Sequence, residues 1–356
     1  MSKLNRIMEF SKKVFIAILA TFLILPVLGL SNASFADEEI NVAIFGSPLP
    51  ENMYAEGENP NQAEIDLGRQ LYYEKRLSKN ADISCNSCHL LDNYGVDNLP
   101  TSPGHKAQLG VRNSPSSYNA AAHIAQFWDG RAKNVEEQAL GPILNPIEMA
   151  MPDRETVLAV LNSMPEYVAA FDRAFPEDSD PVKYENIGEA IGAFEKGLVT
   201  PSPFDRYLAG DTSALTSSQK EGLQVFTESG CIACHNGTYL GGNSYRKVGL
   251  VSAWPTQKDQ GKFEVTGEDS DRMIFKVPSL RNVAMTAPYF HDGAVNNLEE
   301  AIAWMGKYQL GRDLSDTQIK AIVAFLGSLT GEIPTDYIAE PELPPSTDRT
   351  PKPDPN

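Results

Sequence analysis

The residues with the clearest chemistry are two Cys-X-X-Cys-His motifs, Cys85–His89 and Cys231–His235. Two thiols at this spacing can each form a thioether bond to one porphyrin, and the adjacent histidine then reaches the iron as an axial ligand. Each motif therefore predicts one covalently attached haem c. The predicted attachment residues are Cys85, Cys88, Cys231 and Cys234, and the predicted proximal iron ligands are His89 and His235.

The two motifs contain all four cysteines of the chain. A cysteine pair with this spacing is also typical of a redox dithiol or of half a zinc site, so one zinc ion held by four thiolates is the main alternative. Two copies, each followed at once by histidine and placed behind an export-type N-terminus, favour haem.

The first 36 residues have the pattern of a signal peptide. Lys12 and Lys13 precede an apolar run, 14–30, and the residues from Ser34 to Ala36 are suited to cleavage. An apolar run of this length is marginal for a membrane span, which leaves a retained anchor as the lesser alternative. We expect export to the periplasm and cleavage after Ala36.

Composition limits the class of protein further. A length of 356 residues suggests about two domains, and a net charge of −17 argues against nucleic acid as a partner. Such a surface favours small partners that carry a complementary basic patch. The chain has no glycine-rich loop of the kind that binds dinucleotides or phosphates.

Helical periodicity dominates the chain, and no segment shows convincing strand alternation. We therefore expect a mainly α fold with long loops. Helices are expected from residue 61, at 153–168, at 187–198, after the capping box Thr216/Gln219 and after the capping box Ser315/Gln318; long loops are expected at 89–119 and 237–270.

Proline-rich stretches divide the chain, and Pro201 and Pro203 suggest a domain boundary near 205. The predicted parts are a signal peptide (1–36), an N-terminal extension without its own core (37–60), a first haem domain (61–205), a second haem domain (206–333) and a Pro-rich C-terminal tail without its own packing (334–356).

An internal repeat indicates that the two haem domains are related by duplication. Residues 126–130 match 289–293 at a shift of 163 positions, and the same shift superimposes Asn119 on Asn282. The haem motifs are offset by 146 positions, so the second copy has 17 additional residues after its motif.

The sixth iron ligands would separate the possible functions, because a methionine ligand raises the potential of a haem and a displaceable ligand permits small-molecule chemistry. Three histidines remain besides His89 and His235. His105 lies in a Gly/Pro-rich loop, His123 in an Ala-rich stretch expected to be helical, and His291 at the repeat position of Trp128. For the last two we expect structural roles.

Three methionines are candidates for a thioether ligand, Met273, Met285 and Met305. Met305 shares a predicted helix face with apolar residues, so it could equally be a core residue. The residues alone do not decide among the three.

The chain from about residue 60 to 333 resembles the bacterial dihaem cytochrome c peroxidases. The resemblance rests on long motifs, namely 85–89, 97–102, 127–132, 141–143, 145–149 and 288–294. It implies two cytochrome c-like haem domains, the N-terminal one peroxidatic and the C-terminal one an electron store of high potential.

The same resemblance implies roles for single residues. His105 corresponds to the displaceable distal ligand of the first iron, and Met305 to the sixth ligand of the second. Glu148 corresponds to the distal acid–base, Gln138 to a polar partner in the distal pocket, and Trp128 to the aromatic residue between the haems. Core packing is the alternative role of Trp128.

A calcium ion is also implied, held by the side chain of Asn113 and the backbone carbonyls of Thr286 and Pro288; oxygen ligands suit Ca²⁺. The implied activity is reduction of hydrogen peroxide with electrons from a small c-type cytochrome or cupredoxin, and the family suggests a homodimer. Two alternatives remain: a related maturation enzyme that oxidises a partner protein and has Tyr in place of Met305, with Tyr308 close by, and a non-catalytic dihaem electron carrier.

Overall fold

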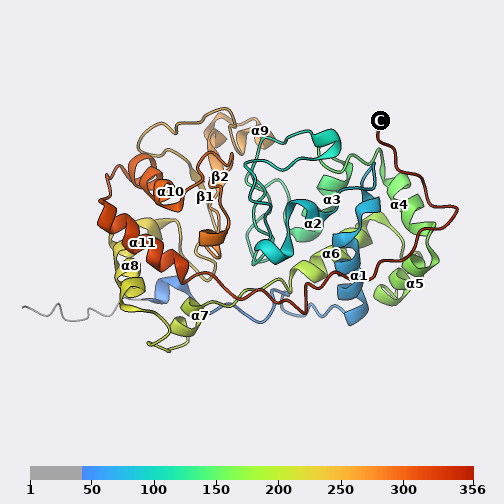
Figure 1. The fold of residues 1–356 in the computed structure, drawn as a ribbon, viewed down its shortest axis with the longest axis horizontal. Helices are drawn as coiled ribbons and strands as arrows, with labels where there is room; N and C mark the ends of the chain where they lie inside the picture. The colour runs from blue at the N-terminus through green and yellow to red at the C-terminus, as the bar shows by residue number, and fades with distance from the viewer. Residues whose placement is uncertain (1–41) are drawn as a thin grey trace, which may run out of the picture. The chain divides into compact units, whose positions relative to one another are not determined.

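The structure is a computed structural model that describes residues 42–356. The predicted signal peptide therefore lies outside the described residues. The fold is mainly helical, as predicted, and Figure 1 shows α1, α3 and α6 grouped in the first half of the chain and α8, α10 and α11 in the second. Within residues 42–356, no helix is long and apolar enough to cross a membrane.

The elements of the first half are α1 (Gln62–Tyr73), α2 (Cys85–Cys88), α3 (Val135–Leu144), α4 (Arg154–Asn162), α5 (Pro165–Ala174), α6 (Tyr184–Glu195) and α7 (Pro203–Leu208). Those of the second half are α8 (Ser217–Glu228), β1 (Tyr245–Lys247), α9 (Phe263–Thr266), β2 (Ile274–Lys276), α10 (Leu298–Trp304), a π-helical turn (Met305–Leu310) and α11 (Asp316–Gly327). Short 3₁₀ turns lie at Val42–Phe45, Lys75–Leu77, Leu91–Asn93, His105–Ala107, Cys231–Ala233, Asp269–Asp271 and Val283–Met285.

Local sequence signals explain where the main helices begin. Asn61 caps α1, its side chain accepting a hydrogen bond of 2.9 Å from the backbone N–H of Glu64. The two predicted capping boxes, Thr216 with Gln219 and Ser315 with Gln318, are confirmed at the starts of α8 and α11. Each box satisfies two backbone N–H groups that the first helical turn leaves unpaired.

The predicted duplication is confirmed by one helix crossing that occurs twice. A Cβ atom at Gly68 of α1 would lie 1.8 Å from the carbonyl oxygen of Ala190 in α6, and one at Gly222 of α8 would lie 1.9 Å from that of Ala321 in α11. Only glycine permits backbones to approach this closely. Each half therefore contains the same tight helix crossing, α1 with α6 in the first half and α8 with α11 in the second.

Thr200 lies between the two copies and contacts an equivalent asparagine of each. Asn119 and Asn282, which the repeat superimposes, each donate a hydrogen bond of 2.8 Å from Nδ2 to Oγ1 of Thr200. Their side-chain oxygens accept the backbone N–H groups of Thr200 and Gly331, respectively. The duplicated asparagines thus fasten the end of each half to a shared buried hydroxyl.

Two local predictions were wrong. The stretch 153–168 contains all of α4 and the start of α5, because Pro165 at the first position of α5 disfavours helical geometry at Met164. The residues around His123 are not helical. The backbone N–H of Ile124 instead donates to the carbonyl of Gly242, so a contact between the halves overrides the helix propensity of the Ala-rich stretch.

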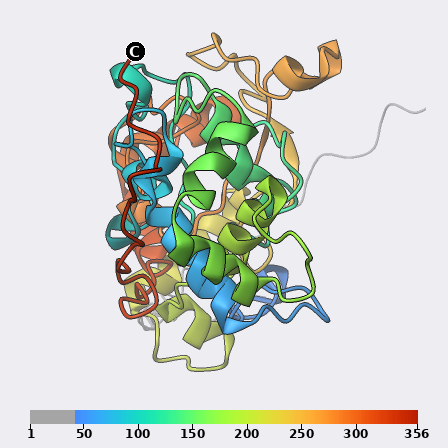
Figure 2. The same cartoon turned by 90° about the vertical axis from the view of Figure 1, so that its right-hand side faces the viewer.

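Both terminal segments pack on the two halves. In the extension, Phe45 is fully buried against Phe204. The C-terminal tail crosses from α11 to the first half, where Tyr337 stacks on Phe194 and Ile338 joins the core cluster. Figure 2 shows this tail beside α1. The prediction that the tail lacks packing of its own missed that it completes the packing of the first half.

The expected loop at 237–270 also contains the short strand β1, which pairs antiparallel with β2. Trp254 anchors this segment: it is 2% exposed and its ring lies 4.7 Å from that of Phe290 and 5.5 Å from that of Trp304. The additional residues of the second copy are therefore held against the end of α10.

Candidate active site

Each Cys-X-X-Cys-His motif lines its own cavity. Among the residues of the first cavity are Cys88, His89, Gln138 and Glu148. Among those of the second cavity are Cys231, Cys234, His235 and Met305. Because the two cysteine pairs line different cavities, they do not form one four-thiolate zinc site, and the described part of the chain contains no cluster of three or more His, Cys, Asp or Glu suited to a metal ion.

The two motif histidines are oriented in the same way. Nδ1 of His89 lies 2.9 Å from the carbonyl oxygen of Pro115, and Nδ1 of His235 lies 3.2 Å from that of Leu240. A hydrogen bond from Nδ1–H to a carbonyl fixes the ring and leaves Nε2 as the free donor for a metal. Burial lowers the pKa of His235 to about 4, which keeps the imidazole neutral.

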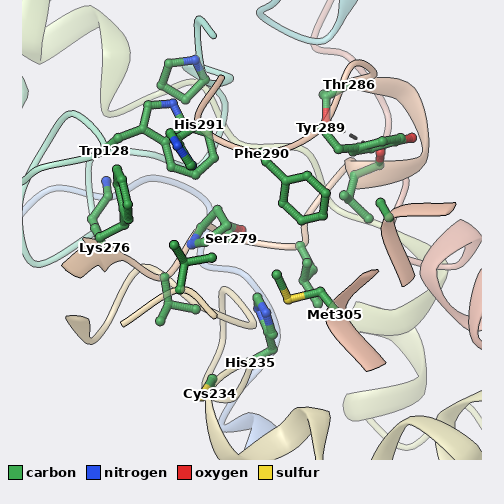
Figure 3. A pocket seen from close by; sticks show the side chains of 18 of the residues that line it. Trp128, Cys234, His235, Lys276, Ser279, Thr286, Tyr289, Phe290, His291 and Met305 are labelled. Carbon is green, nitrogen blue, oxygen red and sulfur yellow. Dashed lines mark hydrogen bonds between the residues drawn. The ribbon is translucent and has the colours of Figure 1, made fainter. Parts of the chain in front are cut away.

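Geometry distinguishes the three candidate methionines. Met305 lies at the junction of α10 and the π-helical turn and lines the second cavity. Figure 3 shows its sulfur beside the ring of His235. Met273 is buried outside both cavities, whereas Met285 is 44% exposed. Met305 is thus the thioether that the fold brings toward the second histidine.

Tyr308 does not take the place of Met305. Its ring packs against Trp254 and Trp304, at 5.7 Å from each, and it is not among the residues that line the second cavity. The structure therefore gives no support to the alternative in which a tyrosine is the sixth ligand.

The first cavity has a different residue at the position of Met305. Shifting α10 by the 163 positions of the repeat places Pro142 on Met305 and Gln138 on Ala301. Pro142 lines the first cavity and has no atom that binds iron. Sequence reasoning missed this substitution, although extending the matched repeat by twelve residues beyond Gly130 would have revealed it.

Glu148 and Gln138 lie together in the lining of the first cavity, from the loop after α3 and from α3 itself. Burial raises the pKa of Glu148, an effect that the charge of Arg131 and a hydrogen bond from Asn145 partly offset. The raised pKa makes this carboxyl group a stronger base than a solvent-exposed glutamate, which suits it to proton transfer.

His105 is buried, at 6% exposure, but is not among the residues that line the first cavity. Its backbone N–H donates a hydrogen bond of 2.8 Å to the carbonyl oxygen of Glu148. A Cβ atom at Gly104 would lie 1.9 Å from the carbonyl oxygen of Ile147, so this loop lies closely on the segment that carries Glu148. The arrangement described here is one in which His105 stands outside the cavity.

Trp128 belongs to the wall that the two cavities share. Its Nε1–H donates a hydrogen bond of 2.9 Å to the carbonyl oxygen of Asn113, and its ring lies 6.4 Å from that of His291. His291 in turn stacks on Phe275 at 4.2 Å. Figure 3 shows Trp128 and His291 side by side. These ring contacts account for the burial of His291 without a role as an iron ligand.

Asn113, Thr286 and Pro288 all line the second cavity. Asn113 Nδ2 donates to the carbonyl of Leu99 at 2.9 Å, which leaves its Oδ1 available as a ligand. Nearby, Asp97 Oδ2 is buried without a hydrogen-bond partner in the described residues. Amide, carbonyl and carboxylate oxygens are the ligand types that suit calcium, so these residues are chemically compatible with that ion.

Lys276 shows that the second cavity fits an anionic group such as a haem propionate. It is 8% exposed, lines the cavity, and has no carboxylate within ion-pair distance among residues 42–356. Its ammonium group donates to the carbonyl of Ala125 at 2.7 Å, and burial lowers its pKa to about 8. A buried cation without a counterion is costly, and a propionate would supply the missing charge.

Comparisons with known proteins agree with this geometry. A family model described as di-haem cytochrome c peroxidase matches residues 62–213, and one described as cytochrome c matches 219–330. The chain is 48% identical over 313 residues to cytochrome c551 peroxidase of Pseudomonas aeruginosa, covering 86% of this chain and 89% of that protein. It is 47% identical over 300 residues to cytochrome c551 peroxidase of Nitrosomonas europaea, covering 84% and 88%.

The chain is also similar, at lower sequence identity, to MauG proteins. Methylamine utilization protein MauG of Methylorubrum extorquens is 32% identical over 308 residues, covering 83% of this chain and 86% of that protein. The solved structure of a MauG-like protein associated with microbial copper homeostasis has a TM-score of 0.73 at 29% identity, covering 82% of this chain and 97% of that one. The duplicated fold has two cavities, each with its own haem-attachment motif and a different lining. Together with these identities, it shows that the chain belongs to the di-haem cytochrome c peroxidase family and is a peroxidase with two c-type haems.

Proposed function

We propose that this protein is a periplasmic peroxidase that reduces hydrogen peroxide to water with electrons from a small c-type cytochrome or cupredoxin. In this proposal electrons enter at the second cavity, with His235 and Met305 as iron ligands, and peroxide reacts at the first, with His89 as proximal ligand. The observation that carries the proposal is that the same helix position holds Met305 in one copy and Pro142 in the other.

When bound, the two haems supply the redox change and the iron to which peroxide coordinates. The chain's own contribution at the first cavity is proton transfer. Glu148 is placed to take the proton from one peroxide oxygen and return it to the other, while Gln138 orients the peroxide by hydrogen bonding. Moving this proton makes the departing oxygen leave as water.

Trp128 is proposed as the route for electrons between the cavities, because it belongs to their shared wall. Its hydrogen bond to Asn113 and its contact with His291 hold the indole ring in place. A fixed aromatic ring in this position shortens the distance that an electron must cross through saturated side chains.

His105 is proposed as a ligand of the first iron in the oxidised resting protein, released before peroxide binds. Lys106 and Ala107 beside it have positive φ angles of 58° and 56°, a strained geometry for residues other than glycine. A loop with two such residues is suited to a change of conformation. That change would move the His105 side chain from its position outside the first cavity into the cavity.

A calcium ion held by Asn113, Thr286 and Pro288 is proposed to couple the two halves. Asn98 of the first half already donates to the carbonyl oxygen of Ala287 at 2.6 Å, between the two proposed carbonyl ligands. Chelation should therefore loosen the contact between the loop that contains Asn98 and the segment that contains Thr286. A homodimer is part of the proposal, and its test is the mass of the purified protein in solution.

Periplasmic export rests on the signal-like pattern of residues 1–36. The N-terminal sequence of the mature protein should begin at Asp37 if the signal is cleaved. If the protein is found in the membrane fraction with residues 1–36 still attached, the signal is not cleaved.

The decisive experiment follows peroxide-dependent oxidation of a reduced small c-type cytochrome, before and after one-electron reduction of the second haem. We expect turnover, rising after this reduction as a five-coordinate high-spin signal develops in the electron paramagnetic resonance and absorption spectra. Two six-coordinate haems with no turnover in either state would identify an electron carrier instead. Oxidation of tryptophan in a partner protein, with slow peroxide reduction, would identify a maturation enzyme.

A further inference from the structure

A buried carboxyl group that the proposed mechanism does not use lines the first cavity. Glu195 is the last residue of α6, is 6% exposed, and lies in the same lining as Gln138 and Glu148. Within residues 42–356, no hydrogen bond or ion pair holds its carboxyl group. An unpaired acid in such a place is unfavourable for stability, so a functional reason is needed.

Glu195 is adjacent to a second buried acid, Glu136 of α3. A Cβ atom at Gly192, one turn before Glu195 on α6, would lie 2.6 Å from Cγ and 2.9 Å from Cδ of Glu136. The glycine therefore makes room for the Glu136 side chain on the face of α6 that leads to Glu195. Oε2 of Glu136 is buried without a hydrogen-bond partner among the described residues.

The other oxygen of Glu136 leads toward solvent. Lys196 forms ion pairs with Oε1 of Glu136 and with Oε1 of Glu58, whose side chain is 31% exposed. Glu58, Lys196 and Glu136 are thus linked by ion pairs from the surface of the N-terminal extension, and Glu136 lies against the face of α6 whose last residue, Glu195, lines the first cavity.

The surroundings of Glu195 favour its protonated form. Facing it are Glu136 from α3, Tyr72 from α1 and Cys85 from α2, with Lys196 next to it in sequence. Burial, and then the charge of Glu136, raise the pKa of Glu195 to about 8. The group can therefore hold a proton at neutral pH and exchange it.

The second half shows that the fold does not require this arrangement. The matching crossings of α6 and α11 superimpose Ala190 on Ala321 and Glu195 on Leu326. Leu326 lines the second cavity, and the repeat partner of Glu136 is the exposed Glu299. Buried carboxyl groups at these positions occur only in the copy that we assign to peroxide.

Reduction of hydrogen peroxide consumes two protons and two electrons at the first cavity: H2O2 + 2 H⁺ + 2 e⁻ gives 2 H2O. A cytochrome or cupredoxin supplies the electrons and no protons, so both protons enter from solvent, while Glu148 only moves a proton between the two oxygens. We propose that Glu58, Lys196, Glu136 and Glu195 form a relay that delivers protons from solvent to the first cavity. This inference rests on the proposed function, since only peroxide reduction consumes protons there.

The test is a single turnover of the fully reduced holoprotein with hydrogen peroxide in weakly buffered solution, with proton uptake followed by a pH-indicator dye. Glu195→Gln keeps the shape and cannot exchange a proton, and Glu195→Leu introduces the residue of the second half. For both we expect proton uptake and turnover to slow about tenfold or more, with a larger solvent deuterium isotope effect. Glu195→Asp should recover part of the rate.

The matched control is Glu185→Gln, which removes an exposed carboxylate of the same helix, 61% exposed, and should leave proton uptake unchanged. Glu58→Gln, outside the cavity lining, tests the outer end of the relay independently of haem incorporation and should slow proton uptake severalfold. Uptake at the wild-type rate in both Glu195→Gln and Glu58→Gln would overturn the relay.

Failure of the proposed function would look different. A wild-type protein without peroxide turnover removes the proposed function, and the relay is then read from the infrared carboxyl band of the resting protein. A band lost in Glu195→Gln, with a midpoint near 8 and shifted in Glu136→Gln, supports the linked pair. A carboxyl group at Glu195 that is already ionised at pH 6 would overturn it.

Discussion

The two halves of this protein have the same backbone plan and different cavity linings. Both contain a helix crossing at a glycine, α1 with α6 and α8 with α11, and both orient a motif histidine through a backbone carbonyl. Where the second half has Met305 and Leu326, the first has Pro142 and Glu195. The backbone plan accommodates either set of side chains, so the proposed division of function between the two cavities would depend on a few residues of their linings.

The largest expected effect comes from removing the proposed distal acid of the first half. Glu148→Gln should lower peroxide turnover about 10²- to 10⁴-fold, because general acid–base catalysis contributes on this scale. Both haem spectra should be retained. The measurement is steady-state oxidation of a reduced cytochrome by peroxide, with Glu137→Gln, an exposed acid of α3, as control. Turnover equal to wild type would remove Glu148 from the mechanism.

Pro142→Met gives the first half the residue of the second. We expect a thioether to compete for the first iron, so that the half-reduced protein shows two six-coordinate haems and binds peroxide poorly. Absorption and electron paramagnetic resonance spectra of the half-reduced protein measure this. A high-spin first haem with normal turnover would show that the open site does not depend on Pro142.

The converse substitution, Met305→Leu, should lower the potential of the second haem by on the order of 0.1 V, because a methionine ligand raises the potential and axial ligands tune it over several tenths of a volt. Redox titration followed by absorbance measures the shift. Met285→Leu, at an exposed methionine outside both cavities, is the control. An unchanged potential would mean that another group ligates the second iron.

The helix crossings should respond alike if the halves are structural equivalents. Gly68→Ala and Gly222→Ala each bring Cβ into a backbone oxygen and should lower the free energy of unfolding by about 3 kcal/mol. Gly327→Ala, in the last turn of α11 with nothing within 4 Å, should be neutral or stabilising by up to about 1 kcal/mol. Denaturant titration compares the three, and a cost in only one half would show that the copies have diverged in packing.

The smallest effect concerns Lys276. Its positive charge beside the second cavity favours the reduced haem, so Lys276→Met should lower that potential by a few tens of millivolts, on the order of 1 kcal/mol. Burial alone lowers the pKa of Lys276 to about 8 and a propionate beside it would raise that pKa again, so the difference in potential between wild type and variant should persist from pH 6 to pH 8. Lys247→Met, at the exposed end of the same lining, should have a smaller effect.

Much of this organisation could be predicted from the sequence because its signals are local or repeated. The haem motifs, the capping boxes and the shift of 163 positions each lie within a few residues or recur at a fixed distance. The same repeat, extended along the chain, aligns Pro142 with Met305. The roles of His105, Trp128 and Glu148 came from family resemblance and stay predictions that the variants above test.

Contacts between distant segments could not be predicted in this way. Lys276 reaches Ala125 from the other half, and the Ala-rich stretch around His123 is held by Gly242. In the sequence, Glu195 looks like an ordinary solvent-exposed acid at the end of a helix. Only the packing of α3 against α6 shows that it is buried. Such features depend on which elements meet in space, which periodicity along the chain does not contain.

The C-terminal tail sets an order of assembly. Tyr337 and Ile338 are supplied by the end of the chain, yet they cover Phe194 and Tyr73, the core of the half that is made first. The first half therefore cannot finish its packing until residues 337 and 338 have been synthesised, by which point both cysteine motifs are present. A fragment that ends at residue 333 would carry all the proposed haem and calcium ligands and still leave one side of α1 and α6 uncovered.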